Sequence, residues 1–562
     1  MVKAKKIFFL FYVFFVTLSL QAYATTTIEN ISLSPTFSCI GIRSTFSGDE
    51  NQNISALLEY RKVGESNWKK GAKLYIDRLD SILEYTNPTT NPYVNQARAS
   101  ILGLDRNSEY EVRITYTDPD GVSGTNPISG TVTTWSHDQP ISSGNTYYVA
   151  TTGSNGYDGS EGTPWETLQY AVDNIAPGDT ILIKSGNYIG FTTNVSGFVN
   201  NYITIKSYDL GNPAIIASQT ILKSDYVHIK NLKFQGGLRI SSAQFNIIED
   251  NEISIIGLQI RSGNVTGTLI QNNYIHDTSE NNDIQLATCI YIRESVYGSV
   301  VIRNNTIRNG YDGIGGERNV TIIAGFEDSD IYNNDISFCL DDGIESEGGN
   351  INNRIWDNKL KNITRNALAT NPVIVGPVYV FRNVAYNSDS GLKIGKGTGK
   401  GYYYHNVFYN NTSDAIHDTD SPAAENLEFK NNVFHGTKYT LEVGGIGHIL
   451  DYNNHDTTAS ARLKWRFHTA DTVERYDTLD LFRAIYTEHE PNGKAISSLF
   501  VDSSNGDFAL QLSSPLIDQG IILYGFNDEN SPWPYEGEAP DIGAVELKDG
   551  ALSPPRNVHI MP

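Results

Sequence analysis

Residues 330–360 read DIYNNDISFCLDDGIESEGGNINNRIWDNKL, and the phrase around Asn334 returns 24 residues later around Asn358. Each phrase places an Asn one or two residues before an apolar side chain. The phrase recurs along the chain, with its marked Asn at positions 251, 273, 305, 334, 358, 383, 406 and 432. A repeat of this length is typical of a solenoid, in which each repeat packs against its neighbours.

A second set of apolar residues repeats in step with the first. Its members are Leu238, Leu258, Ile290, Ile314, Ile344, Leu368, Leu392, Ile416 and Leu441, with three consecutive steps of 24 residues. No long helical pattern lies between these short β-rich runs, so each repeat is expected to be a coil of strands. We therefore predict an all-β fold whose larger part is a parallel β-helix. The marked Asn residues would take left-handed backbone angles at a corner and hydrogen-bond to the coils above and below.

Composition restricts the partners of the protein. The 562-residue chain carries 42 Lys and Arg against 64 Asp and Glu, a net charge of −22. This charge repels phosphate backbones and argues against a nucleic-acid partner. The three cysteines are too few and too scattered for a disulfide framework. An anionic polysaccharide stays open as a substrate, provided that a local cationic cleft or a bound cation offsets the acidic charge.

The N-terminus predicts the compartment. Residues 1–24 have a basic start, an apolar run and a small-x-small cleavage site, the pattern of a secretory signal peptide. We expect a secreted or periplasmic monomer with no transmembrane segment after cleavage. The remaining chain is predicted to form a small β-sandwich (25–135), a linker (136–145), the β-helix (146–547) and a C-terminal tail (548–562).

Two segments resemble known families. Residues 147–150 and 177–181, with residues 499–544 as the last coils, resemble the right-handed parallel β-helix proteins of the pectate-lyase-like superfamily. Trp68, the turn at residues 102–104 and the strand at Tyr110 resemble a fibronectin type III domain. The first resemblance implies a right-handed coil and a carbohydrate-active protein. It leaves the activity open, because the superfamily includes lyases, hydrolases, epimerases and non-catalytic surface proteins.

Strand alternation predicts which residues beside the second apolar set face outward. If the apolar member points inward, the next residue and the one two further on point out. The first outward column is then Arg239, Gln259, Tyr291, Gly315, Glu345, Ala369, Lys393, His417 and Glu442. The second is Ser241, Arg261, Arg293, Glu317, Glu347, Asn371, Gly395, Thr419 and Gly444. Because coils stack about 4.8 Å apart, the two columns form one polar strip.

The most acidic part of this strip is residues 341–347, which read DDGIESE. Carboxylates this close together repel one another unless a cation or a base offsets their charge. One interpretation is a Ca²⁺ site with ligands from Glu345, Glu347 and, one coil earlier, Glu317. The other is a turn followed by a solvated face. Calcium-binding lyases of the superfamily carry a Lys five residues after a similar Glu-x-Glu pair, where this chain has Asn352.

Two basic residues follow Glu345 along the first column. Lys393 lies between glycines on a strand that we expect to be exposed, two coils or about 10 Å beyond Glu345. It is a candidate base, provided that its pKa is lowered, and is otherwise a solubilising lysine. His417 is a candidate proton donor or acceptor, and is otherwise an ordinary exposed histidine.

Four other residues of the strip suit contact with a sugar. Arg261 and Arg293 have the guanidinium geometry that pairs with uronate carboxylates or sulfates. Tyr291 can stack on a sugar ring or donate a phenolic proton, and Asn371 can hydrogen-bond to hydroxyl groups. We predict a substrate-binding role for all four.

These residues predict a polysaccharide lyase that cleaves a uronate-containing polymer by β-elimination. The reaction needs a neutralised carboxylate, a base for the C5 proton and an acid for the leaving oxygen. Ca²⁺ or Arg293 suits the first task, Lys393 the second, and His417 or Tyr291 the third.

Three other functions remain open on the same strip. Stacked carboxylates such as Glu317 and Glu345, about 8 Å apart, suit an inverting glycoside hydrolase with Glu345 as a catalytic residue. A 5-epimerase and a non-catalytic glycan-binding surface protein are the others.

Overall fold

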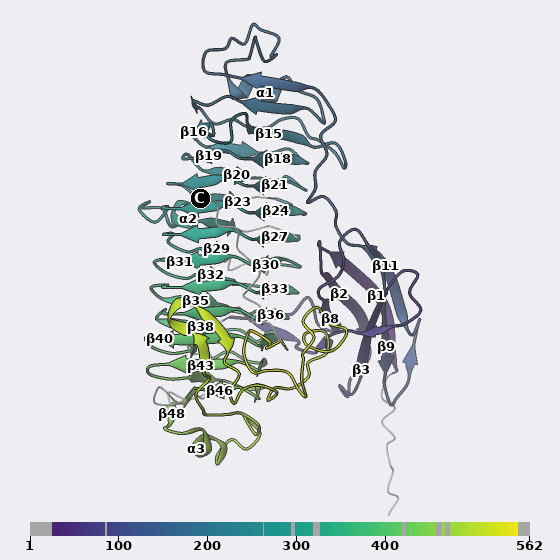
Figure 1. Ribbon diagram of the computed structural model, residues 1–562. Coiled ribbons are helices and arrows are strands. Elements are labelled where there is room, and N and C mark those ends of the chain that lie inside the picture. Colours follow the sequence, from purple (N-terminus) through teal and green to yellow (C-terminus); the bar gives the residue numbers. More distant parts are fainter. Residues whose placement is uncertain are drawn as a thin grey trace, which may run out of the picture.

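The described chain forms a long stack of β-coils with a small β-domain beside it (Figure 1). This computed structural model describes residues 25–84, 87–261, 263–293, 298–317, 326–418, 423–456, 463–466 and 473–548. The predicted signal peptide, and the predicted tail after residue 548, lie outside this range. No helix within the described residues has both the length and the apolar character needed to cross a membrane.

Parallel pairing among the described residues builds three long sheets of thirteen, twelve and nine strands along the stack. Successive coils add successive strands to each sheet, so the predicted parallel β-helix is confirmed. The thirteen-stranded sheet contains β12 (Thr146–Val149), β13 (Thr180–Ile183), β15 (Ile203–Ser207), β18 (Val227–Lys230), β21 (Ile247–Glu249), β24 (Thr268–Gln271), β27 (Val300–Arg303), β30 (Asp330–Tyr332), β33 (Asn353–Trp356), β36 (Val378–Phe381), β39 (Gly401–Tyr404), β42 (Leu427–Lys430) and β45 (Ile449–Asp451).

The other two sheets are made of shorter strands. The twelve-stranded sheet contains β14 (Asn187–Tyr188), β16 (Ile215–Ile216), β19 (Lys233–Phe234), β22 (Glu252–Ser254), β25 (Tyr274–His276), β28 (Thr306–Arg308), β31 (Asp335–Ser337), β34 (Lys359–Lys361), β37 (Val384–Tyr386), β40 (Val407–Asn411), β43 (Val433–Gly436) and β46 (Asn454–His455). The nine-stranded sheet contains β17 (Thr220–Leu222), β20 (Leu238–Ile240), β23 (Leu258–Ile260), β26 (Ile290–Arg293), β29 (Ile314–Glu317), β32 (Ile344–Glu345), β35 (Asn366–Ala369), β38 (Ser390–Ile394) and β41 (Ile416–Asp418).

The second apolar set faces inward, as predicted. Register pairs join Leu238, Leu258, Ile290, Ile314, Ile344, Leu368, Leu392 and Ile416 in that order through the nine-stranded sheet. Each of these side chains is at most 1% exposed and belongs to the main hydrophobic core. The 24-residue step therefore corresponds to one apolar side chain per coil, which stacks on the side chain at the equivalent position of the next coil.

A column of buried Asn side chains, the Asn ladder, joins neighbouring coils at one corner. Asn358 Oδ1 accepts hydrogen bonds from the backbone N–H of Asn334 at 3.1 Å and from its side-chain amide at 3.0 Å. The backbone N–H makes the same ladder bond at every step through Asn251, Asn273, Asn305, Asn334, Asn358, Asn383, Asn406, Asn432 and Asn453. The residue before each ladder Asn, rather than the Asn itself, takes the left-handed backbone conformation.

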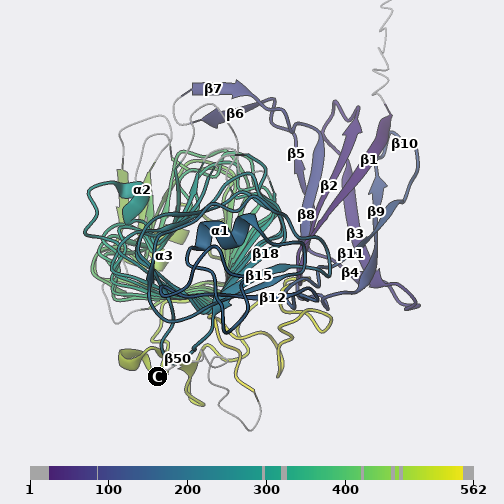
Figure 2. The same ribbon diagram turned by 90° about the horizontal axis from the view of Figure 1, so that it is seen from above.

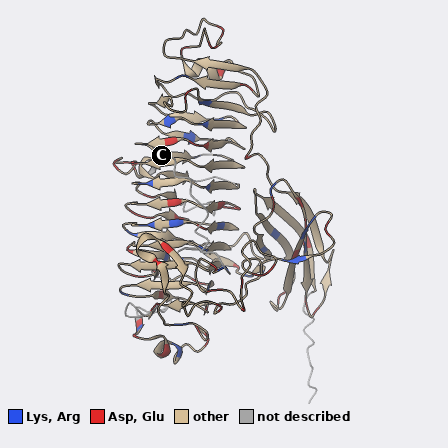
Figure 3. Ribbon diagram, viewed as in Figure 1, with Lys and Arg blue, Asp and Glu red and all other residues tan. Residues whose placement is uncertain are grey.

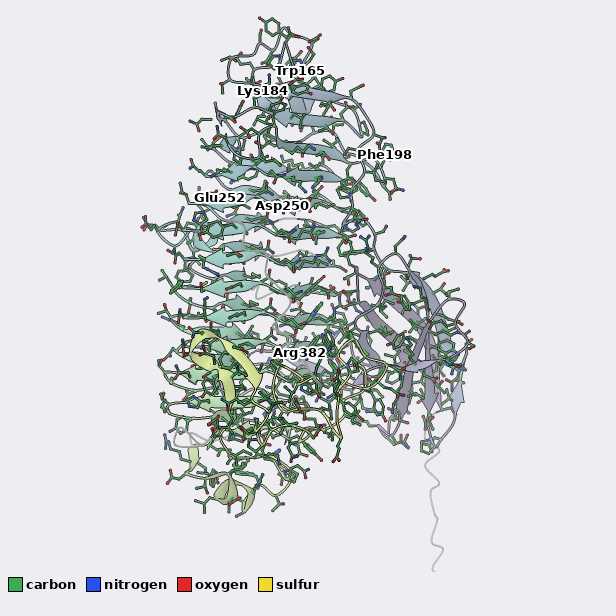
Figure 4. All side chains as sticks on the ribbon, in the orientation of Figure 1. Trp165, Lys184, Phe198, Asp250, Glu252 and Arg382 are labelled. Carbon is green, nitrogen blue, oxygen red and sulfur yellow. The ribbon has the colours of Figure 1, made fainter. Side chains whose placement is uncertain are left out.

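Short helices and inserted strands cover the ends of the β-helix. At the N-terminal end, α1 (Leu168–Asp173) buries Leu168 and Val172 in the main core, and Trp165 stacks on Tyr147 (Figure 4). At the C-terminal end, β44 (Leu441–Gly444), β47 (Leu463–Arg466) and β48 (Val473–Tyr476) form a small sheet. It is followed by α3 (Leu479–Arg483), whose Phe482 also enters the core. A further short helix, α2 (Ile284–Ala287), interrupts one coil.

The prediction that residues 499–544 form the last coils is wrong. The segment contains β49 (Phe500–Asp502), the 3₁₀ helix η1 (Ser503–Asn505) and β50 (Asp507–Leu510), and it packs against the outside of earlier coils. Its Phe508 and Ile542 cover Val407 and Val433 of the twelve-stranded sheet. The physical reason is that several outward positions of these coils are apolar and require a cover.

His405 ties this returning segment to the coils. The buried ring contacts the Gly543 carbonyl through Nδ1 at 3.1 Å, and Nε2 meets the side-chain amides of Asn431 and Asn527 at 3.0 and 2.8 Å. Two amide donors at Nε2 require the neutral ring to carry its proton on Nδ1. Burial, together with the positive charge of Arg382, lowers the pKa of His405 to about 3.

The N-terminal domain has two sheets that share one hydrophobic core, which contains Ile42, Val112 and Ile114. The five-stranded sheet contains β1 (Thr26–Pro35), β2 (Ile40–Ser47), β5 (Tyr75–Asp77), β8 (Gln96–Ile101) and β10 (Val122–Ser123). The four-stranded sheet contains β3 (Ser55–Lys62), β4 (Lys69–Lys70), β9 (Glu109–Thr117) and β11 (Ile128–Thr133). A hairpin of β6 (Ser81–Glu84) and β7 (Asn87–Thr90) extends from this domain toward the β-helix (Figure 2).

The sandwich is fixed to the side of the β-helix by buried polar contacts. Asp330 on β30 pairs with Arg354 at 2.5 Å and accepts a hydrogen bond from Thr36 of the sandwich at 2.6 Å. Arg98 of the sandwich pairs with Asp77 at 2.6 Å and donates to the Gly376 carbonyl at 2.9 Å. Asp330 and Arg354 belong to the β-helix, Arg98 and Asp77 belong to the sandwich, and all four side chains are at most 1% exposed. Separating the two parts would therefore break the hydrogen bonds that join them.

We expect Asn358→Ala to destabilise the β-helix by about 1–3 kcal/mol, because it leaves the buried backbone N–H of Asn334 without its acceptor and removes one acceptor of the Asn334 side-chain amide. Thermal denaturation followed by circular dichroism measures the loss. The control is Asn212→Ala at an exposed turn, which should stay within about 0.5 kcal/mol of wild type. Equal melting temperatures for the two variants would contradict a stabilising role for the ladder.

The buried His405 makes a prediction about pH. Because its pKa lies below the unfolded value, it stabilises the fold above about pH 6.5, and this contribution is lost as the pH falls toward 3. Between pH 7.5 and pH 5, the wild type should lose about 2 kcal/mol more stability than His405→Gln. Melting temperatures of both proteins at both pH values measure the difference, since all other groups titrate alike. Parallel shifts would show that His405 does not titrate with unfolding.

Candidate active site

The predicted outward columns lie on the nine-stranded sheet in the predicted order. Register pairs join Arg239 to Gln259, Tyr291 and Gly315, and join Glu345 to Ala369, Lys393 and His417. The strip is less exposed than alternation alone predicts, because Gln259, Tyr291 and Ala369 are at most 4% exposed. Glu345, Glu347, Lys393 and His417 are half-buried and form the part of the strip nearest solvent. Acidic and basic residues are interspersed along the strands of the β-helix (Figure 3).

A group of four carboxylates surrounds the start of β32. It consists of Glu345 and Glu347 with the buried Asp312 and Asp342, the last two of which the sequence analysis did not single out as site residues. Asp312 Oδ1 accepts a hydrogen bond from the backbone N–H of Asp342 at 3.0 Å. Asp342 Oδ1 in turn accepts one from the side-chain amide of Asn366 at 2.7 Å. Each buried acid is thus held by the coil that follows it.

Burial and mutual repulsion shape the charge of this group, which we call the carboxylate group. Burial, together with the charges of Asp342 and Asp341, raises the pKa of Asp312 to about 7, although the hydrogen bond from the Asp342 N–H lowers it. Burial likewise raises the pKa of Asp342. Burial and the charge of Glu347 raise the pKa of Glu345 well above its usual range. Burial and mutual repulsion thus oppose ionisation of all four acids together, and a bound cation would favour it.

Lys393 is the cation that faces the carboxylate group. Its Nζ lies 3.4 Å from Asp342 Oδ2, and its side chain is 19% exposed. Burial lowers the pKa of Lys393, but Asp342, Glu345 and Glu347 together raise it more strongly, so the net shift is upward. The expectation that Lys393 lies on an exposed strand is therefore wrong, and the condition for its role as a base, a lowered pKa, is not met in this arrangement. The reason is that the coil of β32 places Asp342, Glu345 and Glu347, rather than water alone, around the ammonium group.

His417 lies one coil beyond Lys393 and contacts two acids. Its Nδ1 is 3.1 Å from Asp414 Oδ2 and 3.3 Å from Glu442 Oε2. Burial lowers the pKa of His417, but hydrogen bonds to Asp414 and Glu442 raise it to about 9. These contacts favour the protonated ring at neutral pH, so they do not favour His417 as a base.

The acids at Asp312, Asp342 and Asp414 share a signal that was present in the sequence. Two residues before each inward apolar residue from Ile290 to Ile416, the chain carries Thr288, Asp312, Asp342, Asn366, Ser390 and Asp414. All six are at most 9% exposed, and Thr288 donates to Asp312 Oδ2 at 3.2 Å. A polar residue recurring at this step on the buried side of a strand could have identified the column.

The remaining predicted substrate residues lie apart from the carboxylate group. Arg261 is half-buried on the coil that follows β23, three coils before Glu347. Arg293 pairs in register with Glu317, but the side chains of both lie outside the described residues. Tyr291 and Asn371 are 4% and 5% exposed, which leaves little of either surface for stacking on a sugar. The structure thus brings together Glu345, Glu347, Lys393 and His417 and leaves Arg261 and Tyr291 at a distance.

Sequence comparison places the chain in no described family. No protein-family model matches it. The uncharacterized protein YwoF of Bacillus subtilis (strain 168) is 28% identical over 141 residues, which is 24% of this chain. The match spans 29% of the length of YwoF.

Three solved structures are similar to this chain. Pectate lyase Pel9A has a TM-score of 0.34 at 15% identity, over 73% of this chain and 98% of that one. The complex of XylC with xylose has a TM-score of 0.35 at 11% identity, over 58% and 86%. A rhamnogalacturonan lyase has a TM-score of 0.30 at 14% identity, over 64% and 91%. The parallel β-helix of this protein is established by its own strand pairing.

Proposed function

We propose that this protein is a polysaccharide lyase that cleaves a uronate-containing anionic polymer by β-elimination. The observation that carries the proposal is the position of Lys393 beside the carboxylate group, on the outward side of a continuous sheet. Elimination next to a uronate carboxylate needs a cationic group to neutralise the acid and a base to remove the C5 proton. Lys393 is the residue for the second task. A cation held by the carboxylate group would serve the first.

We further propose that the carboxylate group holds Ca²⁺. Its donors are carboxylate oxygens alone, the ligand type that calcium prefers. Burial and mutual repulsion raise the pKa values of Asp312 and Glu345, and a cation would relieve the repulsion. Asp312, Asp342, Glu345 and Glu347 are the residues that would hold the ion, with Glu317 as the further predicted ligand. Within the described residues no three of these acids have oxygens within 4.8 Å of one another, so binding would draw their side chains together. Bound calcium would neutralise the substrate carboxylate.

Lys393 is the proposed base. A polymer lying along the strip would present its C5 proton to the ammonium-bearing end of this side chain, which is the basic group closest to the carboxylate group. The negative charges of Asp342, Glu345 and Glu347 hold the pKa of Lys393 high, and their neutralisation would favour the free amine. We assign proton donation to the leaving oxygen to solvent water, because His417 is enclosed between Asp414 and Glu442.

A second candidate is an inverting glycoside hydrolase. The observation that favours it is Asp312, whose pKa of about 7 would let a carboxylic acid donate a proton near neutral pH. The hydrolase would cleave the same class of polymer without forming a double bond. The product therefore separates the two candidates.

The setting of the enzyme is part of the same proposal. We propose that the chain is secreted or periplasmic as a monomer, and that the N-terminal sandwich is a fibronectin type III-like domain. The buried Tyr110, whose hydroxyl accepts a hydrogen bond from the Asp105 N–H at 2.9 Å, supports the second point. The hydrogen bonds that join the sandwich to the β-helix favour a structural role for the sandwich over that of a flexible spacer.

Lys393→Ala should lower turnover by about 10²–10⁴-fold, the usual contribution of a positioned proton-transfer group. The assay follows the ultraviolet absorbance of the unsaturated uronate product over a panel of anionic polysaccharides. Lys361→Ala is the matched control, because Lys361 is a half-buried lysine on β34 of the twelve-stranded sheet, and it should keep wild-type turnover.

Two outcomes would contradict this assignment. Near-normal turnover in folded Lys393→Ala would exclude Lys393 as the base. New reducing ends without any absorbance change would replace the lyase by the hydrolase, in which case Asp312→Asn should abolish activity.

Removal of divalent cations should lower the lyase activity, and added Ca²⁺ should restore it. Glu345→Gln combined with Glu347→Gln should reproduce the loss, because two oxygen ligands of the hard cation are removed. Glu252→Gln, on β22 of the twelve-stranded sheet, is the control and should respond to chelator like wild type. Full activity of the wild type in excess chelator would reject the calcium site.

A further inference from the structure

A second group of metal-binding side chains lies at the C-terminal end of the same strip. Asp414, His417 and Glu442 each offer one ligand atom, and these three atoms all lie within 4.8 Å of one another. Within the described part of the chain, no other three His, Cys, Asp or Glu side chains converge in this way. Asp414 and His417 flank the start of β41, and Glu442 comes from β44, one coil later.

The separations of these atoms fit a metal ion. His417 Nδ1 lies 3.1 Å from Asp414 Oδ2 and 3.3 Å from Glu442 Oε2. In a tetrahedral site with ligands about 2.0–2.1 Å from the metal, neighbouring ligand atoms are roughly 3.3 Å apart. Both carboxylates approach the same ring nitrogen, whose single proton cannot point at both of them, whereas one ion can bind all three atoms.

Burial makes the need for a cation stronger. Asp414 and Glu442 are both wholly buried, and they bring two negative charges into the core. Asp414 Oδ1 has no hydrogen-bond donor within the described residues, so this carboxylate is not fully satisfied by the chain. A divalent cation would balance both charges, whereas one imidazolium balances a single charge.

The ligand types indicate which ions would bind. An imidazole nitrogen with two carboxylates suits a first-row ion such as zinc better than calcium, which prefers oxygen alone. Three protein ligands leave one position of a tetrahedral ion open. Because the His417 side chain is 31% exposed on the outward side of the sheet, that position would be reachable from solvent.

We propose that Asp414, His417 and Glu442 form a binding site for a zinc-like divalent cation with one open coordination position. This site is separate from the carboxylate group and does not depend on the lyase proposal. It lies one coil beyond Lys393 on the same column, so a bound ion would place its open coordination position at the end of the strip.

Zinc titration of the full mature chain, purified without a polyhistidine tag and stripped with chelator, tests the site. Isothermal calorimetry should give one zinc ion per chain at this site. His417→Gln and Glu442→Gln should each weaken zinc binding by at least about tenfold. Cobalt bound to the wild type should show the intense visible absorption bands of a four-coordinate ion. This measurement tests the site without any substitution in the chain.

Two variants serve as matched controls. His276→Gln should keep wild-type zinc affinity, because His276 also lies between two acids, Asp277 at 2.7 Å and Glu252 at 3.6 Å, but meets them through different ring nitrogens. Glu345→Gln should also keep wild-type zinc affinity, while its activity should no longer respond to Ca²⁺. The variant therefore distinguishes failure of the proposed zinc site from failure of the proposed calcium site. Absence of zinc binding in the wild type, or binding that folded His417→Gln retains in full, would overturn the proposal.

Discussion

The hydrogen bonds of the Asn ladder are the constraint on which the rest of this structure depends. A side-chain amide repeats on every coil from Asn251 to Asn453, bonds to the next coil, and ends on Glu490, which accepts from Asn453 Nδ2 at 2.7 Å. Each Asn binds both the backbone and the side chain of its neighbour, so every coil must begin at the same height and angle as the one before it. Loops of different length can then enter a coil without shifting the strands that follow.

This fixed register turns the sequence of one coil into columns that run through the whole β-helix. Apolar residues at one position stack into a continuous core, while a position two residues earlier stacks polar side chains that include Asp312 and Asp342. Stacking like charges at strand spacing is unfavourable unless other groups compensate. Lys393 and His417 provide part of that compensation, and the remaining negative charge is what makes this face chemically distinctive.

The sandwich covers an apolar outward face of the β-helix. Outward residues of the thirteen-stranded sheet are aromatic over several coils, including Trp356, Tyr379 and Phe381, and they pack with Cys39 and Leu102 of the sandwich. The contact is completed by buried hydrogen bonds from Thr36 to Asp330 and from Arg98 to the Gly376 carbonyl. Asp330 and Arg98 are each held in place by an ion pair within their own part. The two parts therefore form one structural unit, with the polar strip on another side of the β-helix.

The sequence by itself determined the parallel β-helix, the ladder and the order of residues along the outward columns. The physical reason is that each follows from a period along the chain, and stacking of equal units converts that period directly into position. Only the tertiary structure decided that Lys393 is half-buried beside Asp342, that Asp414 and Glu442 meet at His417, and that residues 499–544 return along the outside. These contacts depend on how side chains from different coils and on covering segments fill the space between them. Burial raises the pKa of Asp312 and neighbouring acids raise that of Lys393, and no spacing along the chain records either effect.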